Sequence, residues 1–367
     1  MKIKAALARE VNQLTIEEVE LAPPKGDEIL VRMQAAGVCH SDLHTYRGEL
    51  RATPPLVIGH EGAGIVETVG KDVTRFKPGD RIVVNWLPSC EICPTCLSGR
   101  YNLCERFADT TFKAMLLDGT SRLKTLDGIT LKHMLSVATM SEYIVINQAN
   151  AVPMPDDVPF EVGAIVGCAV ATGVGAVINT AQARAGLPAA VIGCGGIGLS
   201  AIQGCQVVGC NPIIAVDVLD SKLEFARQLG ATHTINAREV DVVEALKALT
   251  PRGPEYVFDS VGSAATISQA LQAARPGGTA VIVGLHAYKV DTPISSAILV
   301  LQNKRLLGSF VGSIRPRLDL PMLMDLYRAG KLQLDALITK RYPLEALPQA
   351  FEDMEAGRIA RGVLVFG

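Results

Sequence analysis

The feature that most constrains the fold is a strand, a glycine-rich turn and a helix in direct succession, within "AAVIGCGGIGLSAIQGCQVVG" at residues 189–209. Further apolar strands follow at "PIIAVDV", "YVFDSVG" and "TAVIVGL", and "DSKLEFARQLGA" has the pattern of an intervening helix. Apolar strands that alternate with helices are typical of a parallel sheet covered on both faces. The sequence therefore predicts an α/β protein with a doubly wound parallel sheet.

The glycine turn has the spacing G-x-G-x-x-G at Gly193, Gly195 and Gly198, with Gly196 inside it. Such glycines allow a tight turn, close approach of a pyrophosphate, and close packing of the following helix, whose N-terminus faces the phosphates. Asp217 ends the next strand, 19 residues after Gly198. A carboxylate there accepts hydrogen bonds from the adenosine ribose and repels a 2′-phosphate. We therefore predict that NAD, rather than NADP, binds here.

Length and composition limit the other possibilities. A chain of 367 residues exceeds the size of one ordinary core, so two domains are expected. The formal net charge of −2, without a basic block, gives no support to nucleic-acid or membrane-surface binding. The N-terminus lacks the pattern of a signal peptide. The apolar stretch at 162–181 is rich in Gly and Ala, which favours a buried helix over a membrane span. We expect a soluble, cytoplasmic protein.

Four of the nine cysteines lie close together in "CEICPTCLSGRYNLC". Cys90, Cys93, Cys96 and Cys104 could converge on one tetrahedral Zn²⁺, and four thiolates would leave no open position. An iron–sulfur cluster uses the same ligands, and a disulfide pair is a further alternative that a reducing compartment disfavours. We predict a structural zinc site. Other cysteines, including Cys194, Cys205 and Cys210, receive no role.

Several motifs in a fixed order resemble one family along nearly the whole chain. They are "CHSDLH", "GHEGAGIVETVG", the cysteine cluster, "DGTSRL", "GCAVATGVGAV", "GCGGIGLS", "VDVLDSKLEFARQLGAT" and "RPGGTAVIVG". The chain resembles the zinc-dependent alcohol dehydrogenases of the medium-chain dehydrogenase/reductase superfamily. That resemblance implies a GroES-like, partly open β-barrel catalytic domain at 1–169 and 313–367, split by an NAD-binding Rossmann domain at 170–312.

The resemblance also implies a second, catalytic zinc held by Cys39, His60 and Cys168, with the fourth position open to substrate. Nothing in the local sequence joins these three residues. Asp42 would orient His60 by accepting a hydrogen bond from its other ring nitrogen. Glu61 would lie beside the metal and assist exchange of its ligands.

A proton relay follows from the same resemblance. Ser41 would contact the substrate oxygen, and the proton would pass through a ribose hydroxyl to His44, because histidine can exchange protons with water near neutral pH. A solvated loop histidine is the alternative for His44, as a loop-capping carboxylate is for Asp42. The implied reaction is reversible hydride transfer between an alcohol and NAD.

The remaining matched positions concern the cofactor and the substrate. His40 and Arg361 match residues that contact the pyrophosphate, and Lys222 matches one near the adenosine ribose. Thr172 and Ile197 match positions that flank the nicotinamide. Trp86 and Leu50 would line the substrate pocket, where Trp86, the only tryptophan, would favour primary alcohols; a core anchor is the alternative for Trp86.

The branch within the family is less constrained. The long segment between Cys104 and Ser141 resembles that of dimeric members, which favours a homodimer. "DGTSRL" also resembles the thiol-dependent formaldehyde dehydrogenases, but Ser41 and His44 stand where that branch usually carries Thr and Tyr. We therefore predict a general alcohol dehydrogenase, with glutathione- or mycothiol-dependent formaldehyde oxidation as the alternative. A zinc-free quinone reductase and a non-catalytic NAD-binding protein are disfavoured by the complete set of predicted ligands.

Overall fold

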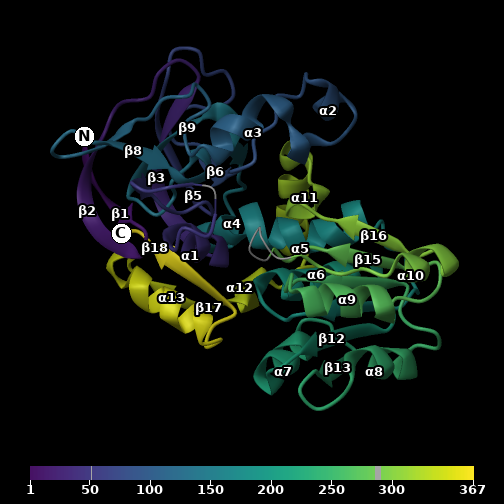
Figure 1. The fold of residues 1–367 in the computed structure, drawn as a ribbon. Coiled ribbons are helices and arrows are strands. Elements are labelled where there is room, and N and C mark those ends of the chain that lie inside the picture. Colours follow the sequence, from purple (N-terminus) through teal and green to yellow (C-terminus); the bar gives the residue numbers. More distant parts are fainter. Residues whose placement is uncertain (51, 286–290) are drawn as a thin grey trace. The chain divides into compact units, whose positions relative to one another are not determined.

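The computed structural model describes residues 1–50, 52–285 and 291–367, and the chain separates into two compact units (Figure 1). The first unit comprises Met1–Cys168, Arg315–Arg328 and Leu334–Gly367. The second comprises Ala169–Ile314 and Ala329–Gln333. The sequence divides the chain into catalytic and nucleotide-binding domains between residues 169 and 170 and between residues 312 and 313. The functions of these domains stay a prediction.

The first unit contains a closed barrel and a larger sheet. The barrel has the strand order β1 (Lys2–Glu10), β2 (Gln13–Leu21), β7 (Leu123–Thr125), β8 (Thr130–His133) and β4 (Leu56–Val57). The sheet has seven strands, in the order β10 (Ala151–Pro153), β6 (Arg81–Val84), β5 (Ala63–Val69), β3 (Glu28–Val38), β18 (Arg361–Val365) and β17 (Ile338–Tyr342), with β9 (Tyr143–Asn147) also paired to β3. The central strand β3 is apolar and mostly buried, which explains its length and its three partner strands. It leads directly into α1 (His40–Tyr46).

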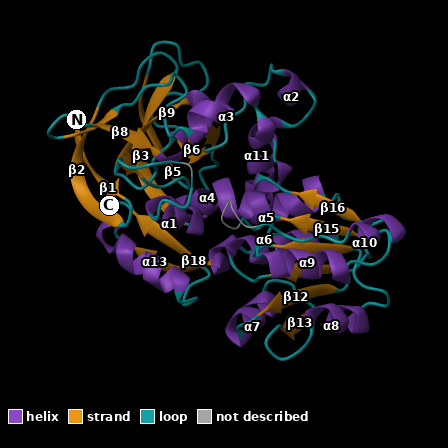
Figure 2. Ribbon diagram, in the orientation of Figure 1, coloured by secondary structure: helices purple, strands orange, loops and turns teal. Residues whose placement is uncertain are grey.

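Besides α1, further helices belong to this unit, drawn in purple in Figure 2. They are α2 (Pro94–Leu97), α3 (Glu105–Phe112), α4 (Phe160–Ile165), α11 (Pro316–Arg328), α12 (Leu334–Leu337) and α13 (Leu347–Glu355). The predicted helix at "LDLPMLMDLYRAGKL" corresponds to α11, which contains Pro321 in its first turns. One core cluster joins α1 and α13 to strands of both sheets through Leu43, Leu347 and Phe351.

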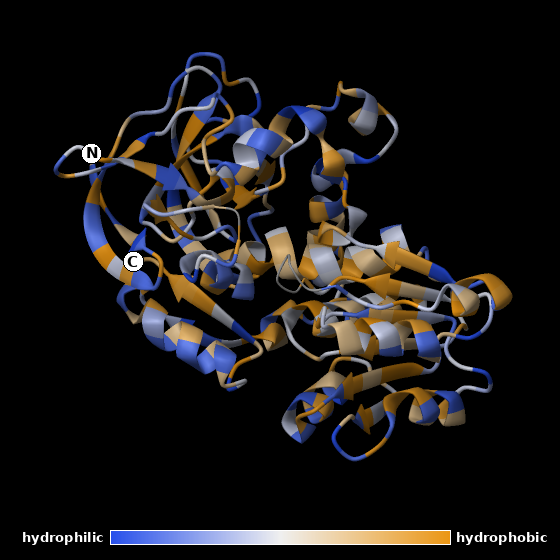
Figure 3. Cartoon of the chain, viewed as in Figure 1, coloured by the Kyte–Doolittle hydropathy of each residue, from blue (hydrophilic) through white to orange (hydrophobic). Residues whose placement is uncertain are grey.

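The second unit contains a six-stranded sheet whose strands are all parallel. The strand order is β13 (His233–Asn236), β12 (Ile213–Asp217), β11 (Ala189–Ile192), β14 (Tyr256–Asp259), β15 (Thr279–Ile282) and β16 (Arg305–Gly308). Figure 3 shows these strands as largely apolar, in accord with burial on both faces. The doubly wound sheet predicted from the sequence is confirmed.

Helices cover both faces of this sheet. They are α5 (Ala171–Gly175), α6 (Gly196–Val208), α7 (Asp220–Gln228), α8 (Val242–Leu249), α9 (Ala264–Ala273) and α10 (Ser296–Leu301). Leu246 of α8 and Leu271 of α9 share a core cluster with the central strands, whereas α5 packs on α6. Gly198 shows why this packing needs glycine, since a Cβ there would collide with the carbonyl oxygen of Gly193.

The long apolar helix runs from Phe160 to Thr180 and contains two π-helical stretches, at Val166–Val170 and Ala176–Thr180. It is long and apolar enough to cross a membrane, but 89% of its most apolar window is buried inside the protein. Burial of that kind is typical of the core helix of a globular protein. The predicted buried helix is therefore found.

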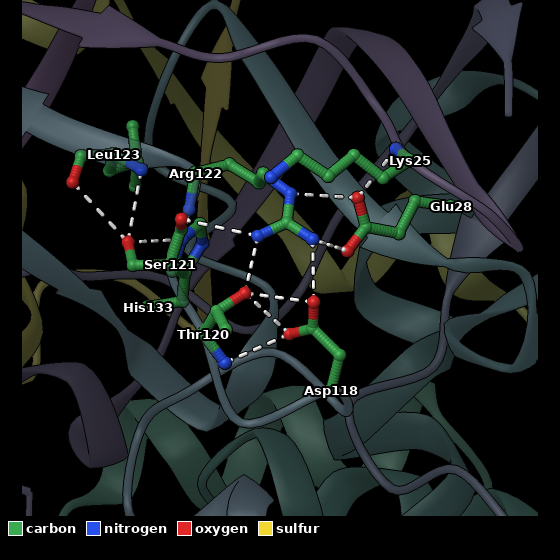
Figure 4. Close-up of polar contacts among 8 residues, drawn as sticks. All are labelled: Lys25, Glu28, Asp118, Thr120, Ser121, Arg122, Leu123 and His133. Atoms are coloured by element: carbon green, nitrogen blue, oxygen red, sulfur yellow. Dashed lines mark hydrogen bonds and ion pairs between the residues drawn. The ribbon is translucent and has the colours of Figure 1, made fainter.

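A buried ion-pair network fixes the long segment between the cysteine cluster and β9, and Figure 4 shows it in detail. The guanidinium of Arg122 donates to both carboxylate oxygens of Glu28, at 2.9 and 2.6 Å, and to Asp118 at 2.6 Å. The backbone N–H of Arg122 donates to Nε2 of His133 at 3.2 Å. Because Nε2 accepts, the imidazole carries its proton on Nδ1 when neutral. The motif "DGTSR" thus ties this segment to the first residue of β3.

Candidate functional site

The four clustered cysteines do converge. The sulfur atoms of Cys90, Cys93, Cys96 and Cys104 lie within 4.8 Å of one another, and all four thiols are free of disulfides. Backbone N–H groups point at the sulfurs: that of Cys93 donates to Cys90 at 3.3 Å, and that of Cys96 donates to Cys93 at 3.4 Å. The N–H of Cys96 lowers the pKa of the Cys93 thiol to about 6. The set matches the ligands of a closed tetrahedral zinc site.

The lobe around these cysteines has little apolar core of its own. The side chains of Ile92 and Leu97 are 68% and 74% exposed. Cys93 caps the N-terminus of helix α2, which begins with Pro94, and Cys104 directly precedes α3. The lobe therefore has few apolar contacts to hold this shape, which fits the structural metal site that the sequence predicts.

The dispersed residues Cys39, His60 and Cys168 also meet. Their ligand atoms, together with a carboxylate oxygen of Glu61, lie within 4.8 Å of one another, and all four residues are buried. Cys39 follows β3, His60 precedes β5, and Cys168 lies in the first π-helical stretch. Gly167 lets this stretch approach β6, because a Cβ there would lie 2.5 Å from the carbonyl oxygen of Val84.

Asp42 holds two of these residues at once. Its Oδ1 lies 2.8 Å from Nδ1 of His60, and its Oδ2 accepts the backbone N–H of Cys39 at 2.9 Å. The Nδ1–H of His60 is thereby directed to Asp42, which leaves Nε2 on the side of Cys168, 3.3 Å from its sulfur. Burial raises the pKa of the Asp42 carboxyl, and the His60 ring opposes that shift.

The thiols and the imidazole form the soft donor set that zinc prefers. The hydrogen bond from Cys168 holds the pKa of the Cys39 thiol well below its usual value. A divalent cation would displace the thiol protons and neutralise the buried charge. The donors present therefore fit a catalytic zinc.

Glu61 also forms a buried ion pair. Its Oε2 forms an ion pair with Nη2 of Arg361, on β18, and both side chains are buried. Burial raises the pKa of the Glu61 carboxyl to about 7, against the opposing charge of Arg361. Only Oε2 is paired, and Oε1 has no hydrogen-bond partner among the described residues, so Glu61 stays beside Cys39, His60 and Cys168. Those three donors alone are the number typical of a zinc site that keeps one open position. The role of Arg361 toward a pyrophosphate stays a prediction.

Of the predicted relay and pocket residues, Ser41 and Trp86 lie beside this cluster. Ser41 Oγ lies 3.8 Å from the sulfur of Cys39. Trp86 is buried, and its ring meets the ring of His60 edge-on, with centroids 5.9 Å apart. His44 pairs through Nδ1 with Glu49 and is half-buried, and Leu50 lies in the turn just beyond. The roles of these side chains in proton transfer and substrate choice stay predictions.

The glycine loop and Asp217 belong to the second unit. Gly193 has a φ of 91°, and Gly195 is the exposed residue that precedes α6, with open space where a side chain would lie. Asp217 accepts the backbone N–H of Cys194 at 2.7 Å and that of Val218 at 2.7 Å. The carboxylate thus fixes the loop against β12 as well as ending the strand. Thr172, Ile197 and Lys222 lie on α5, α6 and α7.

Two buried arrangements were absent from the sequence-based predictions. One is the ion pair between Glu61 and Arg361. Both residues were named separately, but they are 300 residues apart, so the sequence does not pair them. The other is the network of Arg122, Glu28 and His133, in which 94 residues separate Arg122 from Glu28.

Comparisons with known proteins agree with one another. Residues 25–156 match the model of the alcohol dehydrogenase GroES-like domain, and residues 196–329 match that of the zinc-binding dehydrogenase family. The class-3 alcohol dehydrogenase of Cereibacter sphaeroides is 38% identical, over 100% of both chains. The S-(hydroxymethyl)glutathione dehydrogenase of Komagataella pastoris is also 38% identical, over 99% of this chain and 97% of the relative. The benzyl alcohol dehydrogenase of Acinetobacter calcoaceticus has a similar structure, with a TM-score of 0.95 at 31% identity over 100% of both chains.

Proposed function

This chain belongs to the zinc-dependent alcohol dehydrogenases of the medium-chain dehydrogenase/reductase superfamily, and on that premise we propose that it oxidises the S-hydroxymethyl adduct of formaldehyde and a low-molecular-weight thiol. The products would be the S-formyl thioester, NADH and a proton. The proposal rests on two similar relatives, which are named class-3 alcohol dehydrogenase and S-(hydroxymethyl)glutathione dehydrogenase. Their names favour a thiol adduct as the substrate, whereas Ser41 and His44 in the sequence favour a general alcohol dehydrogenase.

Zinc and NAD are the cofactors of this family, and the two clusters are the zinc sites of the chain. When bound, the catalytic zinc supplies a Lewis acid that favours the alkoxide form of a hydroxyl, and NAD supplies the hydride acceptor. Cys39, His60 and Cys168 would hold that zinc, and Asp42 keeps the His60 tautomer that turns Nε2 toward it. Glu61 pairs with Arg361 through Oε2, whereas its Oε1 has no hydrogen-bond partner within the described part of the chain, so this carboxylate stands beside the zinc position.

The proton of the substrate hydroxyl needs acceptors that connect to water. Ser41 lies beside Cys39 and is placed to take the first step. His44 stands one turn further along α1, where its Nδ1 pairs with Glu49.

A second candidate function is the oxidation of simple primary alcohols, and Trp86 favours it. A buried indole in edge contact with a zinc ligand narrows the space beside the metal, which suits a slender or planar primary alcohol. The similarity to a benzyl alcohol dehydrogenase supports the same class.

One set of assays separates the two functions. Formaldehyde oxidation is followed by NADH absorbance with glutathione, with mycothiol and without a thiol, beside a panel of primary and secondary alcohols. We expect formaldehyde oxidation only with a thiol, at a higher kcat/KM than any alcohol, and a strong preference for NAD over NADP. Turnover of primary alcohols without turnover of either adduct would leave the second candidate.

The assembly that we propose is a homodimer joined through the second unit. Strand β16 is an outermost strand of its sheet, and the adjacent helix α10 carries Val300 and Leu301 at 76% and 84% exposure. A second copy would cover this apolar surface and extend the sheet. Light scattering should give a dimer that Leu301→Glu weakens, whereas Leu126→Glu, at an exposed leucine of the first unit, should not.

We place the enzyme in the cytoplasm, where reducing conditions would keep its thiols free.

A further inference from the structure

A pocket opens at the edge of the parallel sheet opposite to the glycine loop. Its volume is about 420 Å³, and its lining includes residues that come just before three strands: Arg252 before β14, Pro276 before β15 and Lys304 before β16. The glycine loop and Asp217, by contrast, follow the carboxyl ends of β11 and β12. The pocket therefore lies apart from the predicted nucleotide site, at the amino ends of the strands.

The charged side chains that line this pocket are all cations. Lys247, Arg252 and Lys304 line it together with glutamine, proline, alanine and isoleucine residues, and none of the lining residues is acidic. Lys247, in the last turn of α8, has Glu244 at 3.2 Å on the exposed side of that helix. Arg252 is exposed, and it has no ion-pair partner within the part of the chain that the structure describes. Three cations around one concave surface attract an anion.

Lys304 makes this a constructed site rather than a chance gathering of surface lysines. Its side chain is buried, with 8% of the residue exposed. Its Nζ donates to the carbonyl oxygens of Leu271 and Gln272, at 2.8 and 3.0 Å, at the C-terminal end of α9. An ammonium has three N–H donors, so one donor remains for a ligand in the pocket. Burial, and then repulsion by Lys247, lower the pKa of Lys304 to about 8. A bound anion would relieve that repulsion.

We propose that this pocket binds a phosphate group, either as inorganic phosphate or as a phosphate monoester. A compact dianion matches an arginine and two lysines that line one pocket whose lining has no acidic residue, with Lys247 also paired to Glu244 on the helix beside it. The volume exceeds the need of a bare phosphate, so the organic part of a small monoester would also fit. This proposal does not depend on the alcohol that the enzyme oxidises.

Titration calorimetry of the zinc-loaded enzyme tests the site. Saturating NADH is present, so that the cofactor's own phosphate contacts are already filled. Inorganic phosphate and glycerol 3-phosphate are titrated separately, with chloride at equal ionic strength as the reference. We expect one phosphate-binding site per chain. The ligand that binds more tightly shows whether the site takes free phosphate or a phosphate monoester. Phosphate that binds no better than chloride would overturn the proposal.

Two variants locate the binding. Arg252→Gln removes an exposed side chain and should leave the fold intact, and Lys304→Met removes the buried ammonium. Each should weaken phosphate binding about tenfold or more, as expected for the loss of a hydrogen bond to a charged group. Lys331→Gln, at an exposed lysine of the same unit, should leave the affinity unchanged. If Arg252→Gln binds phosphate as wild type does, or if Lys331→Gln weakens it equally, the site is not this pocket.

Discussion

The buried imidazole of His133 should make the first unit sensitive to mild acid. Burial, together with the charge of Arg122, lowers the pKa of His133 to about 3. In the unfolded chain its pKa should return to about 6.5. Below that value the unfolded state binds one more proton than the folded state, so stability rises with pH in this range and falls as the pH drops. The full contribution is present above pH 6.5 and is lost progressively toward pH 3.

The size of the effect follows from the two pKa values. One pH unit corresponds to about 1.4 kcal/mol for one proton, so His133 should remove about 2 kcal/mol from the free energy of unfolding between pH 6.5 and pH 5. His133→Gln retains an acceptor for the N–H of Arg122 but cannot take up a proton. The variant should therefore lose about 2 kcal/mol less than wild type over the same interval, whatever its stability at neutral pH.

The single tryptophan makes the measurement specific. Trp86 is buried in the same unit as His133, so its fluorescence reports the unfolding of that unit in urea. Unfolding is measured for both proteins from pH 7 to pH 5, at one zinc concentration. His233→Gln, at an exposed histidine of the other unit, should follow wild type. Parallel curves for wild type and His133→Gln would refute the reasoning, because other titrating groups are common to both proteins.

Four further outcomes are expected. Arg122→Leu should lower the free energy of unfolding by about 3–5 kcal/mol in urea, because it leaves the Glu28 carboxylate buried and unpaired; a change below about 1 kcal/mol would show that the network adds little. Cys93→Ala should lower the zinc content from two ions to one, together with yield and melting temperature, whereas Cys39→Ala should abolish turnover in a protein that still folds and binds NADH. His44→Gln should reduce kcat more at about pH 6.5 than at about pH 9, where hydroxide can replace a relay; a uniform reduction contradicts the relay. Trp86→Ala should raise the kcat/KM ratio of secondary to primary alcohols, and an unchanged ratio assigns the indole to the core alone.

The parallel sheet was predictable because its signals are local. The strands at "AAVI" and "IIAVD" are buried on both faces, so their residue types alone identify them. The small barrel of the first unit gives no such signal. Strand β4 has two residues and β7 has three, and their pairing depends on contacts with β1 and β2, which are distant in sequence. Short strands of this kind are stabilised by their partners rather than by their own composition.

The candidate site divides in the same way. The glycine loop and the four-cysteine cluster have fixed spacings that identify them from the sequence. Cys39, His60 and Cys168 were grouped only through resemblance to a family, because 108 residues separate the last two. The sequence contains no sign that Arg361 would pair with Glu61 rather than face solvent. The grouping of the three ligands and the pairing of Arg361 with Glu61 both depend on burial and on contacts between distant segments. Neither property can be read from a single segment of the chain.

The two cysteine-containing sites also differ in what orients their donors, and that difference fits their separate uses. In the cluster of Cys90, Cys93, Cys96 and Cys104, neighbouring backbone N–H groups orient the sulfurs, so about fifteen residues suffice to build the site around a metal. In the buried site, the side chain of Asp42 orients both His60 and the backbone of Cys39, on elements fixed by the sheet of the first unit. A site that the fold holds in place can leave one coordination position open, because it does not need the fourth ligand for its shape. A lobe that folds around its metal needs all four. Removal of zinc by a chelator should therefore disorder residues near α2 and α3 while the arrangement around Asp42 persists, a contrast that hydrogen exchange can measure directly.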